Sequence, residues 1–228
     1  FETSVMVSLK NHTAKKSTEL LQAKASAAMA DGGAFGFIDG INPVGTINPS
    51  VYERIGRIFS DTQQYEPFLG GELRQDVGNY FSTESKCDFA DNGKRVDDPT
   101  LSSRFPHVDA ALNAAQACIR NHVPFGVLTK KNLKGLSTFR IIVLPNVLMM
   151  DEEETRAFRE YVRDGGRLYA SKYTSLFSKA GVQHADFGLS DVLGVSYAGE
   201  TQEAYTYIAP TQGFEQLYGE YSKEQPLG

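Results

Sequence analysis

Two acidic residues near the beginning of the sequence stand beside strand-like runs and are the first candidates for chemistry. Glu2 lies at the start of FETSVMVSL, and Asp39 ends the apolar run AFGFID. In parallel barrels, side chains at the carboxyl ends of strands face the active site, so carboxylates there are suited to acid–base work. A loop-capping aspartate before Gly40 is the simpler interpretation of Asp39. We therefore predict Glu2 and Asp39 as candidate catalytic residues and leave a structural role open for both.

Few residues fit the position of a serine or cysteine nucleophile. The strand end LYASKYTSLFS offers Ser171, Thr174 and Ser175. A nucleophile elbow has flanking glycines, and no Gly-x-Ser-x-Gly occurs in the sequence. Cys118 falls inside a predicted helix, where a thiol packs rather than reacts. The alternative that remains is an amidotransferase-like or esterase-like hydrolase that uses Ser171 or Ser175 with His184.

Sequence motifs for metals and cofactors are missing. There is no C-x-x-C, no histidine cluster, no G-x-G-x-x-G and no Walker A sequence. The acidic run Asp151–Glu154 offers oxygen ligands, but an acidic first helical turn complements the helix dipole and explains the run without a metal. His184 and Asp186 have a spacing that is common in surface loops. We expect neither a metal nor a cofactor.

Composition restricts the partners. The 228 residues carry a net charge of −5 with no long basic block, which argues against nucleic acid and anionic membrane surfaces. No apolar run reaches the roughly 18–20 residues that a membrane span needs. The two cysteines, Cys87 and Cys118, are expected to be free thiols. The chain starts at Phe1 without a signal-peptide pattern, so we expect a piece of a longer protein and a cytoplasmic location, unless the upstream part carries a signal.

Residues 1–60 alternate between strand and helix patterns. A strand at Thr3–Leu9 is followed by a helix with Ser17 as its N-cap, which ends at Gly32-Gly33. AFGFID is a short buried strand, and Asn48 caps a second helix with a proline at its first position. A helical crossover of this length predicts that the two strands are parallel.

A second alternation begins after Pro67 and Gly70-Gly71. It comprises the strand VGNYFS, a helix from Pro106 to Asn121, the strand PFGVL, the strand FRIIVLPN, a helix from Asp151 to the Gly165-Gly166 pair, the strand RLYASK, a short helix in FGLSDVLGV and a late strand, AYTYIAP. The apolar run in FRIIVLPN predicts a central parallel strand that is covered on both faces. The polar segment Thr83–Phe105 has no periodicity and is predicted as a functional or partly disordered loop.

The first 60 residues hold an ordered series of short motifs. These are Phe1-Glu2-Thr3, Ser17, Gly32-Gly33, the strand Ala34–Asp39, Gly45-Thr46-Ile47-Asn48-Pro49 and Ile55-Gly56. The series resembles the closing strands of an α-L-fucosidase-type (β/α)8 barrel. One departure is that Ile38-Asp39-Gly40 replaces the Asn-Ile-Gly-Pro of that family, which leaves sugar contacts at this point open.

Residues from 73 onward show a second resemblance. FRIIVLPNVLMMDEEETRAFREYVRDGGRLYAS and DFGLSDVLGV are similar to the trimerisation domain of family 42 microbial β-galactosidases. That domain has a flavodoxin-like, class I glutamine-amidotransferase-like α/β fold and lacks the amidotransferase nucleophile. The expected fold is therefore a parallel sheet with flanking helices at 73–228, preceded at 1–70 by a βαβα remnant of a (β/α)8 (TIM) barrel.

The two resemblances imply the C-terminal part of a glycoside hydrolase that acts on carbohydrate. Glycosidases need two carboxylates about 5–9 Å apart across the scissile bond. In the resembled family the nucleophilic aspartate lies on an earlier strand, upstream of Phe1, so the chain alone is expected to be inactive. The resemblance implies a homo-oligomer, a trimer, with Tyr173, Phe177 and Thr83–Phe105 as candidate contacts. The alternative is a non-catalytic module that binds carbohydrate or a partner.

Overall fold

The computed structural model describes residues 1–8, 11–86 and 105–201. The chain divides into two compact units, Phe1–Gln75 and Asp76–Gly228, which we call unit 1 and unit 2. Cys87, the predicted late strand 204–210 and most of the predicted 83–105 loop lie outside the described residues.

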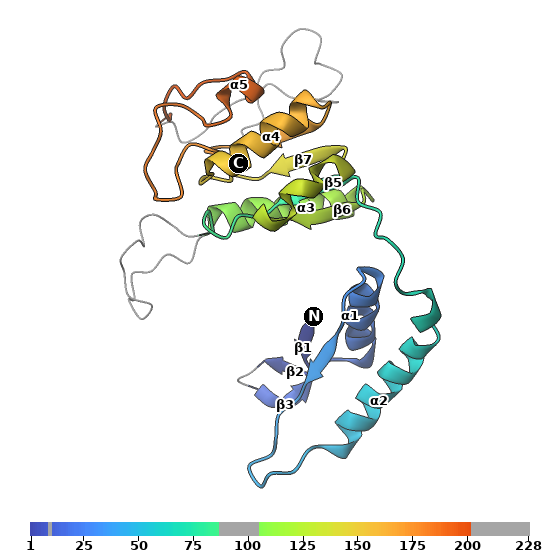
Figure 1. Ribbon diagram of the computed structural model, residues 1–228. Coiled ribbons are helices and arrows are strands. Elements are labelled where there is room, and N and C mark those ends of the chain that lie inside the picture. Colours follow the sequence, from blue (N-terminus) through green and yellow to red (C-terminus); the bar gives the residue numbers. More distant parts are fainter. Residues whose placement is uncertain (9–10, 87–104, 202–228) are drawn as a thin grey trace, which may run out of the picture. The chain divides into compact units, whose positions relative to one another are not determined.

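Unit 1 is built from short strands and α-helices (Figure 1). In chain order these are β1 (Glu2–Ser4), β2 (Met6–Ser8), β3 (Asn11–Lys15), α1 (Thr18–Ala30), β4 (Gly36–Ile38), α2 (Pro49–Gln63) and the 3-10 turn η1 (Glu66–Phe68). Strands β1 and β4 are parallel, as the crossover length predicted. The predicted single strand Thr3–Leu9 is wrong, because the chain breaks after Ser4 and then forms an antiparallel hairpin of β2 with β3.

Both predicted helix caps of unit 1 are confirmed. The Ser17 hydroxyl accepts a hydrogen bond from Leu20 N, and the Asn48 side chain accepts one from Ser50 N. These bonds satisfy amide groups that have no partner within the helix. The caps orient α1 and α2 so that they share a small core, whose fully buried members are Val5, Leu21, Ala25, Val51 and Ile58.

The described residues of unit 2 form a four-stranded parallel sheet with the strand order β6-β5-β7-β8 (Figure 1). Its elements are β5 (Val77–Tyr80), α3 (Pro106–Arg120), β6 (Phe125–Leu128), the 3-10 segment η3 (Lys130–Thr138), β7 (Ile141–Leu144), α4 (Glu152–Arg163), β8 (Arg167–Ala170) and α5 (Ser190–Leu193). The sequence patterns predicted every one of these except η3. That segment lacks a long apolar stripe and is held instead by a capping box at Thr129 and Asn132.

The two faces of this sheet are covered unequally. One face packs against α4, η3 and α5 and forms the main core, which includes Tyr80, Ile142, Leu144, Phe158 and Leu189. On the other face α3 lies over β5, where the Asn79 side chain donates to Ala111 O at 2.9 Å. The prediction that β7 is central is confirmed, but its cover is incomplete on the α3 side.

A cross-strand row shows this incomplete cover. Val127, Asn79, Val143 and Tyr169 are register partners on neighbouring strands and point to the same side of the sheet. Asn79 is buried beneath α3, whereas Val127 and Tyr169 are 63% and 62% exposed on the two edge strands. A parallel sheet is ordinarily covered on both faces, and the described residues leave the flanks of this face without a covering layer.

Candidate functional site

The carboxyl edge of the unit 2 sheet is where an open α/β sheet ordinarily binds its ligand. Strand β5 is central, with β6 added on one side and β7 on the other, so the chain reverses its winding direction there. The loops after β5 and β7 consequently leave the sheet in opposite directions, and ligands enter the crevice between them. The residues in these loops decide what the edge can do.

A buried histidine fills this crevice. Ser82 N, after β5, donates to His107 Nε2 at 2.9 Å, and His107 Nδ1 donates to Pro145 O, after β7, at 2.8 Å. The imidazole is fully buried, and burial lowers the pKa of His107 although the carbonyls of Pro145 and Asn146 act in the opposite direction. Neutral His107 therefore connects the loop after β5 to the loop after β7 through its two ring nitrogens.

The hydroxyl groups at this edge also hold the backbone. Ser171 Oγ accepts from Asn146 N at 3.0 Å, and Ser175 Oγ accepts from Leu189 N at 3.1 Å. Thr174 Oγ1 accepts from Val147 N at 3.1 Å. The three hydroxyls that the sequence offered as nucleophiles thus each fix one loop to another.

Ser175 and His184 are brought to the same surface cavity, of about 550 Å³, together with Asp186. Across the described residues, however, no hydrogen bond joins the Ser175 hydroxyl to the His184 ring. The Asp186 carboxylate does not orient that ring but accepts from Phe187 N at 2.8 Å and Tyr197 N at 2.7 Å. The geometry gives a shared cavity without the hydrogen-bonded chain that activates a serine.

A buried carboxylate, Glu154, lies behind the same edge. Tyr80 Oη donates to Glu154 Oε1 at 2.5 Å, and Asp151 N donates to Oε2 at 3.0 Å. Lys179 Nζ forms an ion pair with Oε2 at 2.8 Å and a second with Glu84 Oε2 at 3.2 Å. Glu154 is fully buried and both of its oxygens are engaged, so it serves as a structural anchor rather than a general base.

The pKa shifts in this cluster agree with that role. Burial raises the pKa of Tyr80, and the hydrogen bond and charge of Glu154 raise it further, so the phenol stays protonated. Burial alone would raise the pKa of Glu84, but a backbone hydrogen bond and Lys179 outweigh it and the net shift is downward. The neutral phenol of Tyr80 donates to Glu154, and the ammonium group of Lys179 forms ion pairs with both carboxylates of the cluster.

The run Asp151–Glu154 is accounted for by this arrangement. Asp151 is the N-cap of α4 and Glu154 is its third residue, and the two close a capping box. Lys130 forms ion pairs with Asp151 and Glu153. No group of three or more His, Cys, Asp or Glu residues able to hold a metal ion occurs within residues 1–8, 11–86 and 105–201.

Unit 1 places its two candidate carboxylates at opposite ends of one strand pair. Glu2 begins β1 opposite Gly36, whereas Asp39 directly follows β4 at its carboxyl end. Three residue steps along the strand, from Gly36 to Asp39, separate these positions, which corresponds to roughly 10 Å. Asp39 forms a 2.6 Å ion pair with Lys15, and its side chain is 2% exposed. The structure does not bring Glu2 and Asp39 together as a pair.

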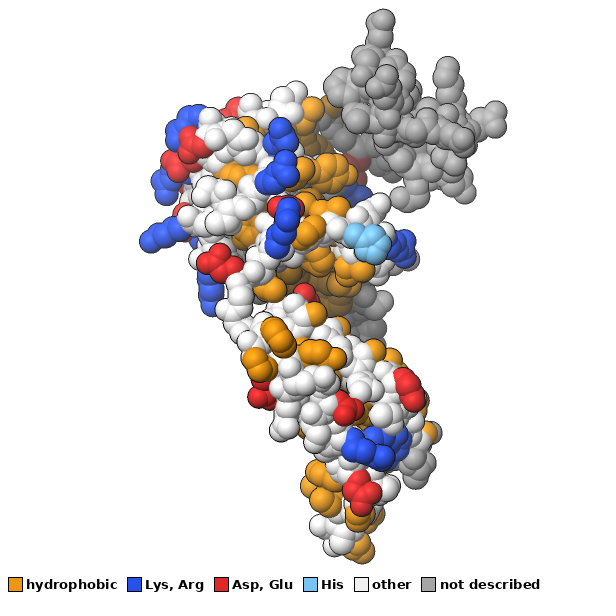
Figure 2. All heavy atoms as spheres, turned by 90° about the vertical axis from the view of Figure 1, so that its right-hand side faces the viewer, with side chains coloured by type: hydrophobic (Ala, Val, Ile, Leu, Met, Phe, Trp, Pro, Cys, Tyr) orange, Lys and Arg blue, Asp and Glu red, His pale blue; other side chains and the backbone are white. Residues whose placement is uncertain are grey.

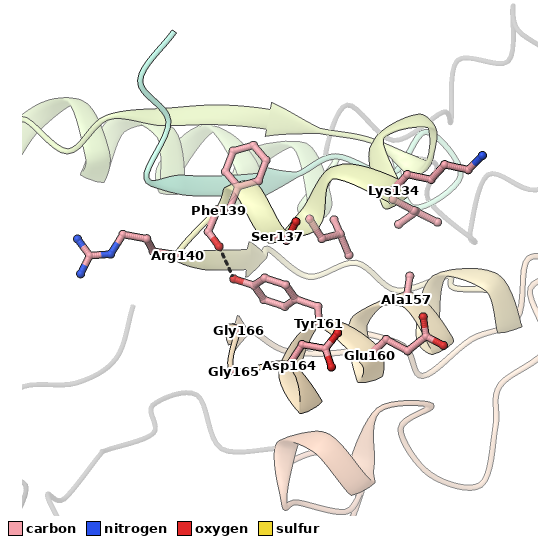
Figure 3. A pocket seen from close by; sticks show the side chains of 12 residues that line it. Lys134, Ser137, Phe139, Arg140, Ala157, Glu160, Tyr161, Asp164, Gly165 and Gly166 are labelled. Carbon is pink, nitrogen blue, oxygen red and sulfur yellow. Dashed lines mark hydrogen bonds between the residues drawn. The ribbon is translucent and has the colours of Figure 1, made fainter. Parts of the chain in front are cut away.

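A further cavity, of about 450 Å³, opens at the amino edge between η3 and α4 (Figure 3). The Tyr161 ring lies beside Gly166, and its hydroxyl donates to Phe139 O at 2.9 Å. A Cβ at position 166 would meet that ring at 2.3–2.5 Å, so the glycine leaves room for the tyrosine. The amino edge is opposite to the usual ligand edge of such sheets, and this cavity is explained by packing.

Cys118 behaves as a packing residue. It lies half-buried on α3, and burial raises its pKa, which disfavours the reactive thiolate. In the part of the chain that the structure describes, no helix is both long and apolar enough to cross a membrane.

Comparison with known proteins identifies the fold. No protein-family model matches the sequence, and no curated protein matches it. Among solved structures, a β-galactosidase from Bacillus circulans sp. alkalophilus matches 92% of this chain with a TM-score of 0.68 and 13% identity. A β-galactosidase from Rahnella sp. R3 matches 88% of this chain with a TM-score of 0.66 and 18% identity. The α-L-fucosidase isoenzyme 2 from Paenibacillus thiaminolyticus matches 76% of this chain with a TM-score of 0.58 and 16% identity.

These matches show a fold similar to that of glycoside hydrolase structures, and at such identities they show the fold alone. The chain spans 32%, 32% and 25% of the length of the three matched structures, respectively. The mixed α/β class with a parallel sheet and flanking helices is confirmed.

Sequence reasoning did not find the two groups that organise the carboxyl edge, His107 and Glu154. The available signals were a histidine directly after the first proline of a helix and an acidic residue three positions after the N-cap Asp151. The second signal is typical of a capping box. Neither signal reveals burial. Glu154 is buried because Tyr80 and Lys179 reach it from distant segments, and His107 is buried between Ser82 and Pro145.

Replacing the buried carboxylate tests its structural role. Glu154→Gln removes one of the two ion-pair partners of Lys179 and puts an amide NH2 group where a carboxylate oxygen accepted a hydrogen bond. We therefore expect the free energy of unfolding of unit 2 to fall by about 3–5 kcal/mol. Urea unfolding followed by circular dichroism measures this loss. Glu152→Gln, an exposed change in the same helical turn, should cost less than about 0.5 kcal/mol. Equal, small losses for both variants would show that the anchor carries no stability.

The neutral buried histidine predicts a pH dependence. Below the ordinary histidine pKa of about 6.5 the unfolded chain binds a proton that folded His107 does not, because its folded pKa is lower. The free energy of unfolding should therefore be highest above about pH 6.5. It should fall by at most about 1.4 kcal/mol per pH unit as the pH drops toward the lowered pKa of His107. Urea midpoints between pH 7.5 and pH 5 measure the slope. His107→Gln should flatten it, whereas exposed His122→Gln should not, and a slope that survives His107→Gln would contradict the assignment.

Proposed function

We propose that this chain is the part of a glycoside hydrolase that supports bond cleavage without performing it. Unit 1 would supply closing elements of a (β/α)8 barrel, and unit 2 would be an accessory α/β domain that assembles copies of the protein. The observation that carries the proposal is a fold shared with two β-galactosidases and an α-L-fucosidase over 76–92% of this chain but only 25–32% of theirs.

The carboxylate geometry supports the non-catalytic part of this proposal. Hydrolysis needs two carboxylates about 5–9 Å apart with the scissile bond between them. Asp39 is held by Lys15, and Glu2 lies at the other end of the strand pair. In unit 2, Glu84 and Glu154 share Lys179, and Glu154 is sealed in the core. Neither arrangement offers one exposed acid opposite one exposed nucleophile.

Unit 1 also presents hydrophobic side chains that suit a larger barrel. In the loop that joins β4 to α2, Ile41 is 70% exposed, Val44 82% and Ile47 46%. Figure 2 shows hydrophobic side chains gathered at this end of the unit. Such a cluster on a small unit is typical of a surface that contacts further protein, and further elements of a barrel would provide that contact.

An assay of the chain with chromogenic sugars tests the absence of catalysis. We expect 4-nitrophenol release from 4-nitrophenyl β-D-galactopyranoside and 4-nitrophenyl α-L-fucopyranoside to equal a buffer blank. The matched control is the double variant Glu2→Gln/Asp39→Asn, which should give the same rate. If the natural chain released 4-nitrophenol and the double variant did not, the proposal would be overturned and the two carboxylates would be assigned to catalysis.

The open face of the unit 2 sheet supports assembly with a second copy. We call it the α3 face, and its members are Leu112 and Ile119 on α3, Val127 on β6, Val143 on β7 and Tyr169 on β8. Leu112 and Ile119 are seven residues apart and share one side of the helix. Self-association would bury this apolar patch against a second copy, and a specific interface needs about 800 Å² from each copy.

The earlier contact candidates contribute less to this face. Phe177 is only partly exposed and bridges the backbone at Met149, and Tyr173 lines a pocket at the carboxyl edge. The resemblance to the trimerisation domain implies a trimer. The α3 face supports self-association but does not determine the number of copies.

Light scattering coupled to size exclusion tests the assembly. We expect the chain to elute at a multiple of its 25.1 kDa mass. Val127→Lys should shift it to 25.1 kDa, because an ammonium group in an apolar interface has no partner. Val195→Lys changes another exposed valine, which follows α5 outside the α3 face, and should leave the mass unchanged. A natural chain that stays monomeric at every concentration tested would contradict assembly through this chain.

A further inference from the structure

An aromatic pocket lies at the carboxyl edge, just beyond β8. It has a volume of about 350 Å³, and its lining includes Lys172, Tyr173, Phe187, Tyr197, Gly199 and Glu200. That volume is within the range of small-molecule sites, and the position is on the ligand side of a parallel sheet. Lys172 has a φ of 50°, a left-handed conformation that is costly for a lysine and is found preferentially at functional turns.

The pocket has a rigid apolar corner. The Phe187 and Tyr197 rings meet edge to face, with centroids 5.7 Å apart and planes at 83°. The Asp186 carboxylate accepts hydrogen bonds from the backbone N–H of both residues. These bonds lower the pKa of Asp186, so the group that fixes the corner remains ionised. Two rings held by one charged group are preorganised, which reduces the entropy cost of binding.

Polar groups border this corner. Burial, and after it a hydrogen bond to Glu200, raises the pKa of Tyr173, so the phenol and the carboxylate lie side by side. Lys172 adds an ammonium donor on an exposed side chain. The lining in the described part of the chain thus contains one cation and one anion, which balance. A neutral ligand with several hydroxyl groups suits such a lining better than an ion does.

We propose that this pocket binds a neutral pyranose ring. Aromatic faces carry negative charge density and attract the weakly positive C–H bonds on one side of a sugar ring, while its hydroxyls reach donors and acceptors at the rim. Here Phe187 and Tyr197 provide the apolar wall, and Tyr173, Glu200 and Lys172 provide the polar rim. The inference rests on the proposed function for its substrate class: unit 2 would hold part of a carbohydrate chain away from the bond that is cleaved.

Saturation-transfer NMR with methyl β-D-galactopyranoside and methyl α-L-fucopyranoside tests the pocket on the whole chain. A single ring in a shallow site should bind with a dissociation constant on the order of 1 mM. Tyr197→Ala removes one wall and should weaken binding about tenfold. Glu200→Gln keeps the shape, removes the charge and should weaken binding about fivefold.

Tyr52→Ala is the matched control, because Tyr52 is an exposed tyrosine of α2 outside the pocket, and this variant should bind the sugars like the natural chain. Absence of saturation transfer to either sugar at about 20 mM would overturn the proposal. So would equal binding by the natural chain and both pocket variants, and so would binding of galactosamine or galacturonate in place of the neutral sugars. The nitrophenol assay and the mass measurement do not depend on this pocket. A negative NMR result would therefore leave the proposed supporting role standing, and a negative result in the other two experiments would leave the proposed sugar site standing.

Discussion

The architecture of unit 2 depends on one buried carboxylate. Glu154 receives a hydrogen bond from Tyr80 on β5, another from Asp151 N at the start of α4, and an ion pair from Lys179 in the segment after β8. Three distant parts of the chain therefore meet at one charge. A charge in a dry core is tolerated only when it is paired and hydrogen-bonded, so these partners determine together where α4 lies on the sheet.

The same demand for partners accounts for the chemistry that is missing from the carboxyl edge. His107 spans the crevice in which an open α/β sheet usually holds its ligand, and the hydroxyls of Ser171 and Ser175 hold backbone N–H groups. Groups committed to such bonds are poor nucleophiles and bases, because reaction would leave buried polar atoms without partners. Binding capacity is found instead at the periphery of the edge, where the rings of Phe187 and Tyr197 border solvent.

The two units share an incomplete layer structure, and this links the fold to the proposed role. Among the described residues, unit 1 pairs β1 with β4 in a two-stranded sheet, and α3 is the helix that lies on the second face of the unit 2 sheet. Apolar side chains such as Val44, Val127 and Tyr169 are consequently exposed. Burial of apolar area is the main stabilising contribution to association, so both units are suited to a larger assembly.

Local signals in the sequence determined most of the elements. Ser17 and Asn48 mark helix starts because their side chains bond to nearby amides, and the apolar run at Ile141–Leu144 predicts a central strand because such strands are buried on two sides. Tertiary structure alone decided that Glu154 is an internal anchor, that Glu2 and Asp39 are apart, and that Phe187 meets Tyr197. Caps and periodicity act within a few residues, whereas burial and pairing of charges depend on segments that are distant in the chain.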